Sequence, residues 1–304
     1  MQVILLPLQN TKTLPDCALS IGNFDGVHYG HRELLKRLRK EADARHLRAS
    51  LLTFEPHSKN PFNKPSRLST LRDKLTLLSE TNMLDQVFVC RFTKEFSTLK
   101  AQDFIDQILI EKLKTKYLLI GDDFHFGANR LGDITHLTRQ QEFVTETMPT
   151  AFIDGERASS SLVRDALIKG DLDKAHRLLV KPYQITGKVA HGRAFGKQLG
   201  FPTANIYLPC NKAVFEGVFI IEATGVFGKK YGVANLGKSP TVHYNRHYKL
   251  ETYLFDYCDT LYGQLMTVYF IKKLRTEKHF DSIEALKVQI HQDVKQAKKY
   301  WGLQ

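Results

Sequence analysis

The feature that most constrains the fold of this chain is a change of sequence pattern near residue 182. Before that point, short apolar or β-branched runs alternate with longer segments of helical periodicity, which is typical of a parallel sheet covered by helices on both faces. After Pro182, five strand-like runs follow one another with Gly, Asn and Pro turns and no helix between them. This second pattern predicts an antiparallel sheet that forms a small barrel.

The two patterns indicate an α/β domain over residues 1–181 and a β domain over residues 182–304. In the first domain we predict helices over 32–47, 68–80 and 101–113 and strands over 18–22, 49–54, 85–90 and 116–121. In the second we predict strands over 183–190, 216–224, 230–237, 249–257 and 265–274. One terminal helix follows, with Asp281 and Glu284 in capping-box spacing and an apolar face formed by Ile283, Leu286, Ile290, Val294 and Ala297.

Composition narrows the class of protein. A chain of 304 residues that is 42% hydrophobic can bury a substantial core, and its length suggests two domains. No apolar stretch is long enough to span a membrane, and the N-terminal segment lacks the basic start and small-residue cleavage site of a secretory signal. The cysteines, Cys17, Cys90, Cys210 and Cys258, form no CxxC pair. We therefore expect a cytoplasmic protein with reduced thiols and no membrane partner, and the oligomeric state stays open.

The formal net charge of +12 points to an anionic partner. Nucleic acid is one such partner, and small phosphorylated ligands are another. The basic residues are dispersed, however, and none of the basic stretches is interleaved with the stacking aromatics that single-strand binding favours. The charge alone does not choose between the two partners, although the dispersion of the basic residues favours no nucleic acid.

A corner between a strand and a helix carries two histidines in the run SIGNFDGVHYGHRELL, residues 20–35. Glycines at 22, 26 and 30 let the backbone turn and approach a ligand, and the helix that begins after Gly30 directs its free N–H groups into the same space. His28 and His31 can donate to phosphate oxygens without being permanently cationic. The alternative is a pair of helix-capping histidines, but an HxGH run at such a corner is a specific signal.

A second phosphate cradle is predicted late in the same domain. Ser159, Ser160 and Ser161 lead into a helix that carries Arg164 one turn later. Hydroxyls and N–H groups at a helix start, together with an arginine, suit a phosphate. Taken alone, the pattern is equally typical of an ordinary serine-capped helix.

Together the two motifs resemble the nucleotidylyltransferase superfamily, with Ala158 where its members usually have Ile. The runs TFEPH (53–57) and GDDFHFGANRLGD (121–133) narrow the likeness to the adenylyltransferase module of bacterial bifunctional riboflavin kinases and FAD synthetases. The resemblance implies a Rossmann-like domain in which the phosphate of FMN attacks the α-phosphorus of ATP. It implies catalytic roles for His28, His31 and Arg164, and ATP contacts from Gly22, Asn23, Phe24, Asp25, Gly30 and Ser159–Ser161. Asp123, Phe124 and Phe126 would bind the flavin, although each phenylalanine alone could be a core residue.

The second domain resembles riboflavin kinases through the run GKVAHGRAFGKQLGFPTANI, residues 187–206. The resemblance implies that Gly192, Gly196 and Gly200 close over ATP and that Thr203 and Asn205 hold Mg²⁺. Glu251 stands at the position of the catalytic base, and Arg275 and Glu277 match the segment that faces the flavin. Two departures are Tyr253, where histidine is usual, and the turn Gly237–Ser239.

The resemblance therefore implies a bifunctional enzyme that makes FMN from riboflavin and ATP in the barrel and FAD from FMN and ATP in the α/β domain. Two alternatives are a nucleotidylyltransferase for another phosphorylated substrate with a degenerate barrel, and a nucleic-acid-binding protein that uses the barrel as a platform. The intact PTAN run, Glu251 and the LRTE run (274–277) argue against the first. A salt-dependent shift with RNA would favour the second.

Overall fold

The computed structural model describes residues 1–6, 14–55, 67–192, 196, 199–208, 215–238 and 248–303. His57, Cys210 and Ser239, which belong to the motifs and cysteines above, lie outside the described residues. The chain forms two compact units, one of residues 1–64 with 74–159 and the other of residues 65–73 with 160–304. Residues 160–181 thus share a unit with the C-terminal part, and the functional boundary after residue 181 stays a prediction.

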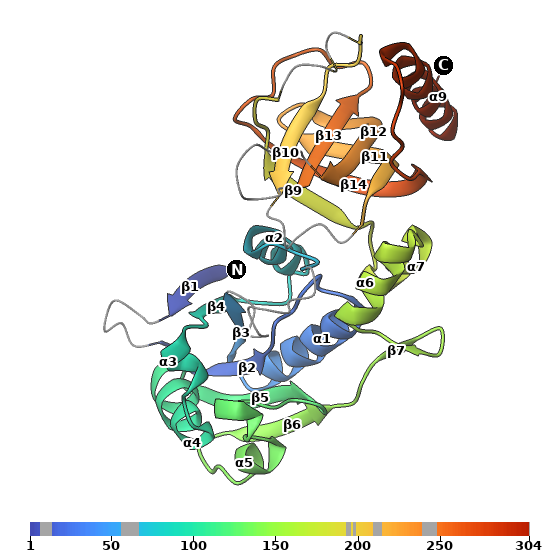
Figure 1. The fold of residues 1–304 in the computed structure, drawn as a ribbon. Coiled ribbons are helices and arrows are strands. Elements are labelled where there is room, and N and C mark those ends of the chain that lie inside the picture. The colour runs from blue at the N-terminus through green and yellow to red at the C-terminus, as the bar shows by residue number, and fades with distance from the viewer. Residues whose placement is uncertain are drawn as a thin grey trace. The chain divides into compact units, whose positions relative to one another are not determined.

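The first unit is built on a parallel sheet, which confirms the predicted α/β class (Figure 1). Within the described residues six strands pair in the order β1-β4-β3-β2-β5-β6, and every pair is parallel. The strands are β1 (Gln2–Leu6), β2 (Cys17–Ile21), β3 (Arg48–Glu55), β4 (Gln86–Arg91), β5 (Thr115–Gly121) and β6 (Val144–Met148), and a small antiparallel pair is formed by β7 (Phe152–Ile153) and β8 (Glu156–Arg157). The helical elements are α1 (Tyr29–Ala44), α2 (Leu71–Glu80), α3 (Lys94–Ser97), α4 (Ala101–Asp103), η1 (Phe104–Lys112), η2 (Ala128–Arg130) and α5 (Ile134–Thr138).

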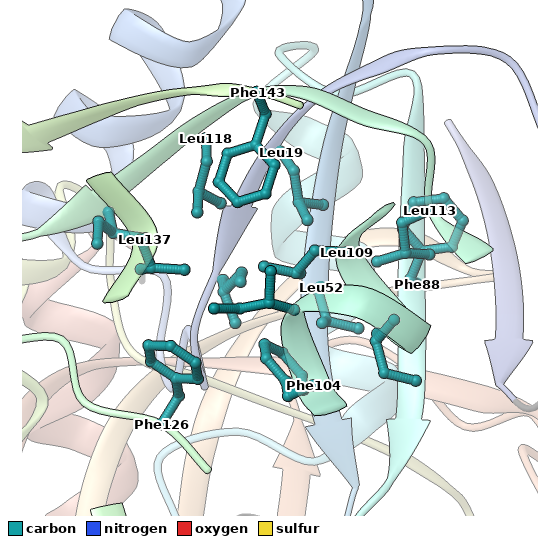
Figure 2. Packing of buried hydrophobic residues seen from close by; sticks show 14 of the residues in the cluster. Leu19, Leu52, Phe88, Phe104, Leu109, Leu113, Leu118, Phe126, Leu137 and Phe143 are labelled. Carbon is teal, nitrogen blue, oxygen red and sulfur yellow. The ribbon is translucent and has the colours of Figure 1, made fainter. Parts of the chain in front are cut away.

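Helices cover both faces of this sheet because alternate strand residues point to opposite sides. On one face, Leu19 of β2 and Leu118 of β5 pack with Leu109 of η1 and Leu137 of α5, as Figure 2 shows. The same cluster contains Leu52, Phe88, Phe104, Leu113, Phe126 and Phe143. On the other face, α1 contacts β2, β3 and β5 and buries Leu35, Leu38 and Ala42.

Several details of the first unit differ from the prediction. The segment predicted as one helix over 101–113 begins as a single α-helical turn and continues as the π-helical η1, where the Leu113 N–H donates to the Ile108 carbonyl five residues back at 2.9 Å. The strands β1 and β6 were not predicted. β6 has no buried residue, and its sequence VTETM lacks the regular alternation of apolar and polar side chains that predicts a strand.

The second unit contains an antiparallel sheet, which confirms the predicted class, and the described strands pair in the order β10-β13-β12-β11-β14-β9. A bridge between Ala190, just after β9, and Asn205 of β10 joins the two ends of this order, so the sheet forms a nearly closed barrel (Figure 1). Its strands are β9 (Gln184–Lys188), β10 (Ala204–Leu208), β11 (Gly217–Gly225), β12 (Gly228–Lys238), β13 (Tyr248–Leu254) and β14 (Leu265–Arg275). The helices are α6 (Ser160–Lys169), α7 (Leu172–Leu179) and α9 (Ile283–Tyr300).

The terminal helix was predicted with the wrong cap. Its N-cap is Ser282, whose hydroxyl accepts from the Ala285 N–H at 3.1 Å, and Asp281 precedes it. The shift moves Ile283 to the first helical position, where it is 53% exposed, whereas Ala297 is buried as predicted. The strand β10 was also missed, because the Pro202 before it reads as a turn signal.

Candidate functional sites

The corner that follows β2 has a tightly bent backbone. Phe24, Gly26 and Val27 all have positive φ, at 48°, 80° and 45°. Asp25 and Val27 are buried within this turn, and the helix α1 starts at Tyr29, three residues before the start of the predicted range 32–47. Gly30 thus lies inside the first helical turn, close to the helix end that attracts anions.

The two histidines of the corner stack on each other. Their ring centroids are 3.6 Å apart, and the ring of Phe24 stacks on His31 at 4.5 Å. His28 occupies the N-cap position of α1, but its side chain makes no capping hydrogen bond. Within the described residues, the Nδ1 atoms of both rings are buried and have no hydrogen-bond partner. The side chain of His28 is therefore not a helix cap, and both rings have nitrogen atoms left for a ligand.

Both histidines are neutral at physiological pH. Burial is the main reason that the pKa of His28 falls to about 4, and the nearby Arg157 lowers it further while Asp25 acts in the opposite direction. Burial, then His28 and then Lys74 hold the pKa of His31 well below its ordinary value. The rings can therefore donate one N–H each without a permanent charge.

The structure brings the start of the serine motif to the histidine corner. A Cβ atom on Gly30 would lie 3.3 Å from the Ala158 carbonyl oxygen and 3.4 Å from the His28 ring. Ala158 can approach the start of α1 this closely because glycine has no side chain. Ala158 and Ser159 belong to the first unit, whereas Ser160, Ser161 and Arg164 lie on α6 of the second. A shared site for His31 and Arg164 stays a prediction.

The predicted flavin residues of the first unit have different surroundings. Asp123 forms an ion pair with Arg157 at 2.5 Å. Phe124 is partly exposed, and its ring stacks on Phe126 at 5.6 Å. Phe126 is 7% exposed and belongs to the core cluster with Phe104. The surroundings of Phe126 are those of an ordinary core residue. Of the two predicted flavin phenylalanines, Phe124 is therefore the one with an exposed surface.

A cavity of about 770 Å³ lies in the second unit. Its volume is within the range of small-molecule sites. Five of the predicted kinase residues line it, namely Gly196, Thr203, Glu251, Arg275 and Glu277. Apolar side chains, among them Phe201, Val218, Val233, Leu286 and Ile290, form much of the remaining wall. Tyr253, the departure from the family pattern, also lines the cavity and packs edge-on against Phe201 at 5.3 Å.

Strand pairing places the predicted metal ligands next to the predicted base. Asn205 of β10 lies directly opposite Glu251 of β13, and Asn235 of β12 lies opposite Glu251 on the other side. Asn205 is 4% exposed, and its Oδ1 has no hydrogen-bond partner within the described residues. Its Nδ2 donates to the Thr203 carbonyl at 3.4 Å. Glu251 forms an ion pair with Lys249 at 2.8 Å.

The predicted flavin residues of the barrel are held by neighbours that the sequence did not indicate. Arg275 directs Nε and Nη2 to the carboxylate of Asp293 on α9, at 3.0 and 2.8 Å, and Asp293 is 4% exposed. This pair fixes α9 beside the cavity. Glu277 accepts from Asn235 Nδ2 at 2.9 Å. A Cβ on Gly237 would come within 1.9 Å of Glu277 Oε1, so the glycine leaves room for that carboxylate.

The glycines of the predicted ATP loop pack closely on the PTAN segment. A Cβ on Gly192 would lie 2.3 Å from Asn205 Nδ2, and one on Gly196 would lie 2.5 Å from the Phe201 carbonyl oxygen. Gly200 has a φ of 89°, which glycine adopts without strain. Gly192 and Gly200 do not line the cavity.

Sequence reasoning missed Lys74, Arg157, Asn235 and Asp293, which contact or electrostatically influence predicted site residues. Arg157 stands directly before the serine motif, and Asn235 stands in the GVANLG run, so extending those motifs by a few residues would have found both. Lys74 and Asp293 lie on helical faces without any motif.

Two classes of feature are absent from the part of the chain that the structure describes. No helix there is long and apolar enough to cross a membrane. Nor does that part hold a group of three or more His, Cys, Asp or Glu side chains arranged to bind a metal ion.

Comparison with known proteins identifies both halves of the chain. Residues 10–162 match the FAD synthetase family, and residues 179–301 match the riboflavin kinase family. Bifunctional riboflavin kinase/FMN adenylyltransferases from Haemophilus influenzae and Escherichia coli K12 are both 41% identical to this chain. The matched region spans 96% of this chain and 96% of the Haemophilus influenzae protein. For the Escherichia coli protein it spans 94% of this chain and 93% of that protein. A crystal structure described as a macrolide-efflux protein from Streptococcus pneumoniae is 25% identical, has a TM-score of 0.82 and covers 96% of this chain and 97% of its own. The resemblance inferred from the motifs is confirmed, and the chain belongs to the family of bifunctional riboflavin kinase/FMN adenylyltransferases.

Proposed function

We propose that the cavity of the barrel phosphorylates riboflavin and that the histidine corner of the first unit adenylylates FMN. The observation that supports the first assignment best is the convergence of Thr203, Glu251 and Glu277 on one cavity large enough for a flavin. The stacked neutral histidines at a helix start support the second. ATP is the co-substrate of both reactions.

In the kinase reaction, Glu251 accepts the proton of the ribityl hydroxyl as that oxygen attacks the γ-phosphorus of ATP. The P–O bond to ADP breaks, and ADP leaves. The apolar wall with Val218 and Ile290 suits the isoalloxazine ring, and Glu277 offers a carboxylate to its polar edge. Arg275 acts mainly through its bond to Asp293, by holding α9 in place.

Magnesium fits the donor set beside the base. Asn205 Oδ1 is a buried oxygen without a partner in the described residues, and the Thr203 side chain lines the cavity. Such neutral oxygens suit Mg²⁺, which usually keeps waters and takes phosphate oxygens as further ligands. Thr203 and Asn205 would hold the ion, which would neutralise charge on the transferred phosphoryl group.

In the adenylyltransferase reaction, a phosphate oxygen of FMN attacks the α-phosphorus of ATP and pyrophosphate leaves. His28 and His31 donate N–H groups to phosphate oxygens as negative charge builds up in the transition state. Gly22, Asn23, Phe24, Asp25 and Gly30 shape the turn, and Ser159, Ser160, Ser161 and Arg164 bind the remaining phosphates. Phe124 and Asp123 contact the flavin. We expect both reactions to take place in the cytoplasm.

The assay that tests the proposal separates riboflavin, FMN and FAD by chromatography after incubation with ATP and Mg²⁺. In His31→Ala we expect FAD formation to fall by roughly 10²–10³, as typically follows loss of a donor at the transition state, with riboflavin phosphorylation retained. Equal loss of both activities would contradict the assignment of separate reactions to separate sites.

A further inference from the structure

The turn that presents the histidines needs contacts to hold it. Phe24 and Val27 both have left-handed φ values, 48° and 45°, which are unfavourable for bulky side chains and most of all for β-branched ones. Such backbone conformations are strained, and they persist only where the surrounding structure fixes them. The atoms that tie down this turn therefore bear directly on where the histidine rings lie.

A buried lysine provides one such tie. Lys74, in the first half of α2, is 2% exposed, and its ammonium group donates to the Thr53 hydroxyl on β3 at 3.1 Å. That hydroxyl, on a fully buried residue, donates in turn to the Asn23 carbonyl oxygen at 3.3 Å. Asn23 immediately precedes the first left-handed residue. Two hydrogen bonds in series thus connect α2 to the backbone of the turn.

We propose that Lys74 is a positioning residue for adenylyl transfer, which holds the Asn23 turn, and with it the histidine pair, through the hydroxyl of Thr53. The inference rests on the proposed function of this corner. Hydrogen bonds donated by an ammonium group are about twice as strong as neutral ones, and lysines are almost never fully buried unless paired. The close stack of the two rings also leaves little tolerance for a shift of the turn.

The test measures kcat and KM for FAD formation from FMN and ATP, with riboflavin phosphorylation in the same protein as the internal reference. Lys74→Met keeps an unbranched side chain that is one heavy atom shorter and cannot donate. We expect kcat to fall about 10–100-fold while KM changes little, as for a small misplacement of catalytic groups. Thr53→Val should lower kcat in the same direction, and Thr53→Ser, which restores the hydroxyl, should recover most of it. Lys36→Met removes an exposed lysine of α1 and is the matched control.

A double variant shows whether the two residues act in series. If they do, Lys74→Met with Thr53→Val is no slower than the slower of the two single variants, whereas independent roles would multiply the losses and overturn the proposal. If Lys74→Met does not fold, Thr53→Val against Thr53→Ser decides the question, and parent kcat in Thr53→Val refutes the relay. His31→Ala separates the two proposals, because parent FAD formation in that variant removes the proposed function itself. A loss in His31→Ala together with parent rates in Lys74→Met and Thr53→Val removes only the positioning role.

Histidine titration by NMR tests separately whether the charge of Lys74 reaches the histidine pair. Among the residues that the structure describes, the groups that act on the two rings are Asp25, Arg157, Lys74 and the rings themselves. Since the positive charge of Lys74 lowers the pKa of His31, that pKa should rise in Lys74→Met and stay unchanged in Lys36→Met. An unchanged pKa in Lys74→Met would mean that the lysine does not act on the histidine pair.

Discussion

Replacement of Glu251 by glutamine separates proton acceptance from every other property of that side chain. The amide keeps the shape and volume of the carboxylate but cannot take the proton of the ribityl hydroxyl. A general base typically contributes 10²–10⁴-fold to a rate, which corresponds to about 3–5 kcal/mol of transition-state stabilisation. We therefore expect Glu251→Gln to form FMN from riboflavin at least 100-fold more slowly and to convert supplied FMN to FAD at the parent rate.

The structure predicts a much smaller effect on stability. Glu251 forms an ion pair with Lys249 at 2.8 Å, but the two side chains are 34% and 21% exposed. Pairs with that much exposure are worth roughly 0–1 kcal/mol after solvent screening. Unfolding of this unit can be followed in urea through Trp301, the single tryptophan, which stacks on Tyr231 of β12. The urea midpoint of Glu251→Gln should shift by no more than the loss of that one ion pair, roughly 0–1 kcal/mol, would produce.

Lys249→Gln is the matched control, because it breaks the same ion pair and leaves the carboxylate in place. It should lose no more stability than Glu251→Gln and keep riboflavin phosphorylation within a few-fold of the parent. Two results would refute the reasoning. Parent kinase activity in Glu251→Gln would show that Glu251 is not the base, and equal losses in the two variants would assign the effect to the ion pair.

Three further outcomes are expected from other contacts. Gly237→Ala should displace the Glu277 carboxylate from Asn235, because the Cβ of the new alanine would lie 1.9 Å from Glu277 Oε1. The KM for riboflavin should rise up to about tenfold, which corresponds to the loss of one hydrogen bond, and FAD formation from FMN should be unchanged. Asp293→Asn should weaken the bond to Arg275 and lower the unfolding free energy of the second unit by roughly 1.5–3 kcal/mol, read from Trp301 fluorescence in urea. The pKa of His28 is about 4 in the folded protein and near 6.5 in the unfolded chain, so the unfolding free energy of the first unit should fall by about 3 kcal/mol in full as the pH drops through that window. Hydrogen exchange of the β2–α1 peptides measures this loss of stability, which should be smaller in His28→Gln.

The sequence predicted the architecture because both patterns are physically strong. Buried parallel strands require runs such as ASLLTF, residues 49–54, and the observed β3 is almost wholly buried along that run. Elements at the edges were harder to predict. The strand β6 has polar, partly exposed residues and is held by pairing with β5 rather than by its own pattern. The cap of α9 was assigned one residue too early, because Asp281 and Ser282 are both good caps and only the fold decides which hydroxyl or carboxylate meets the first turn.

The candidate sites divide in the same way. The sequence marks His31 as a candidate because two histidines stand at a fixed spacing in a glycine-rich corner, and it marks Glu251 through the resemblance to riboflavin kinases. The residues that contact the candidate sites come from elements far away in the sequence, and nothing local marks them. Lys74 reaches the histidine turn from α2, and Asp293 reaches Arg275 from α9. In a periodic helix pattern a lysine or an aspartate is expected on the solvated polar face. That Lys74 and Asp293 are buried and contact the candidate sites could therefore be seen only in the three-dimensional structure.

Unpartnered buried polar atoms are informative about function only in combination with a second feature. An unsatisfied buried group costs roughly 1–3 kcal/mol. Within the described residues Gln184 has such atoms, although it belongs to neither candidate site. An orphan atom by itself therefore does not identify a ligand. At Asn205 the orphan oxygen lies on the strand paired to the proposed base, and at His28 the orphan nitrogen belongs to a ring stack beside a turn with positive φ values. In both places the unpartnered atom thus stands beside a second feature of a proposed site, and a magnesium ion bound at Asn205 or a phosphate bound at His28 would satisfy it.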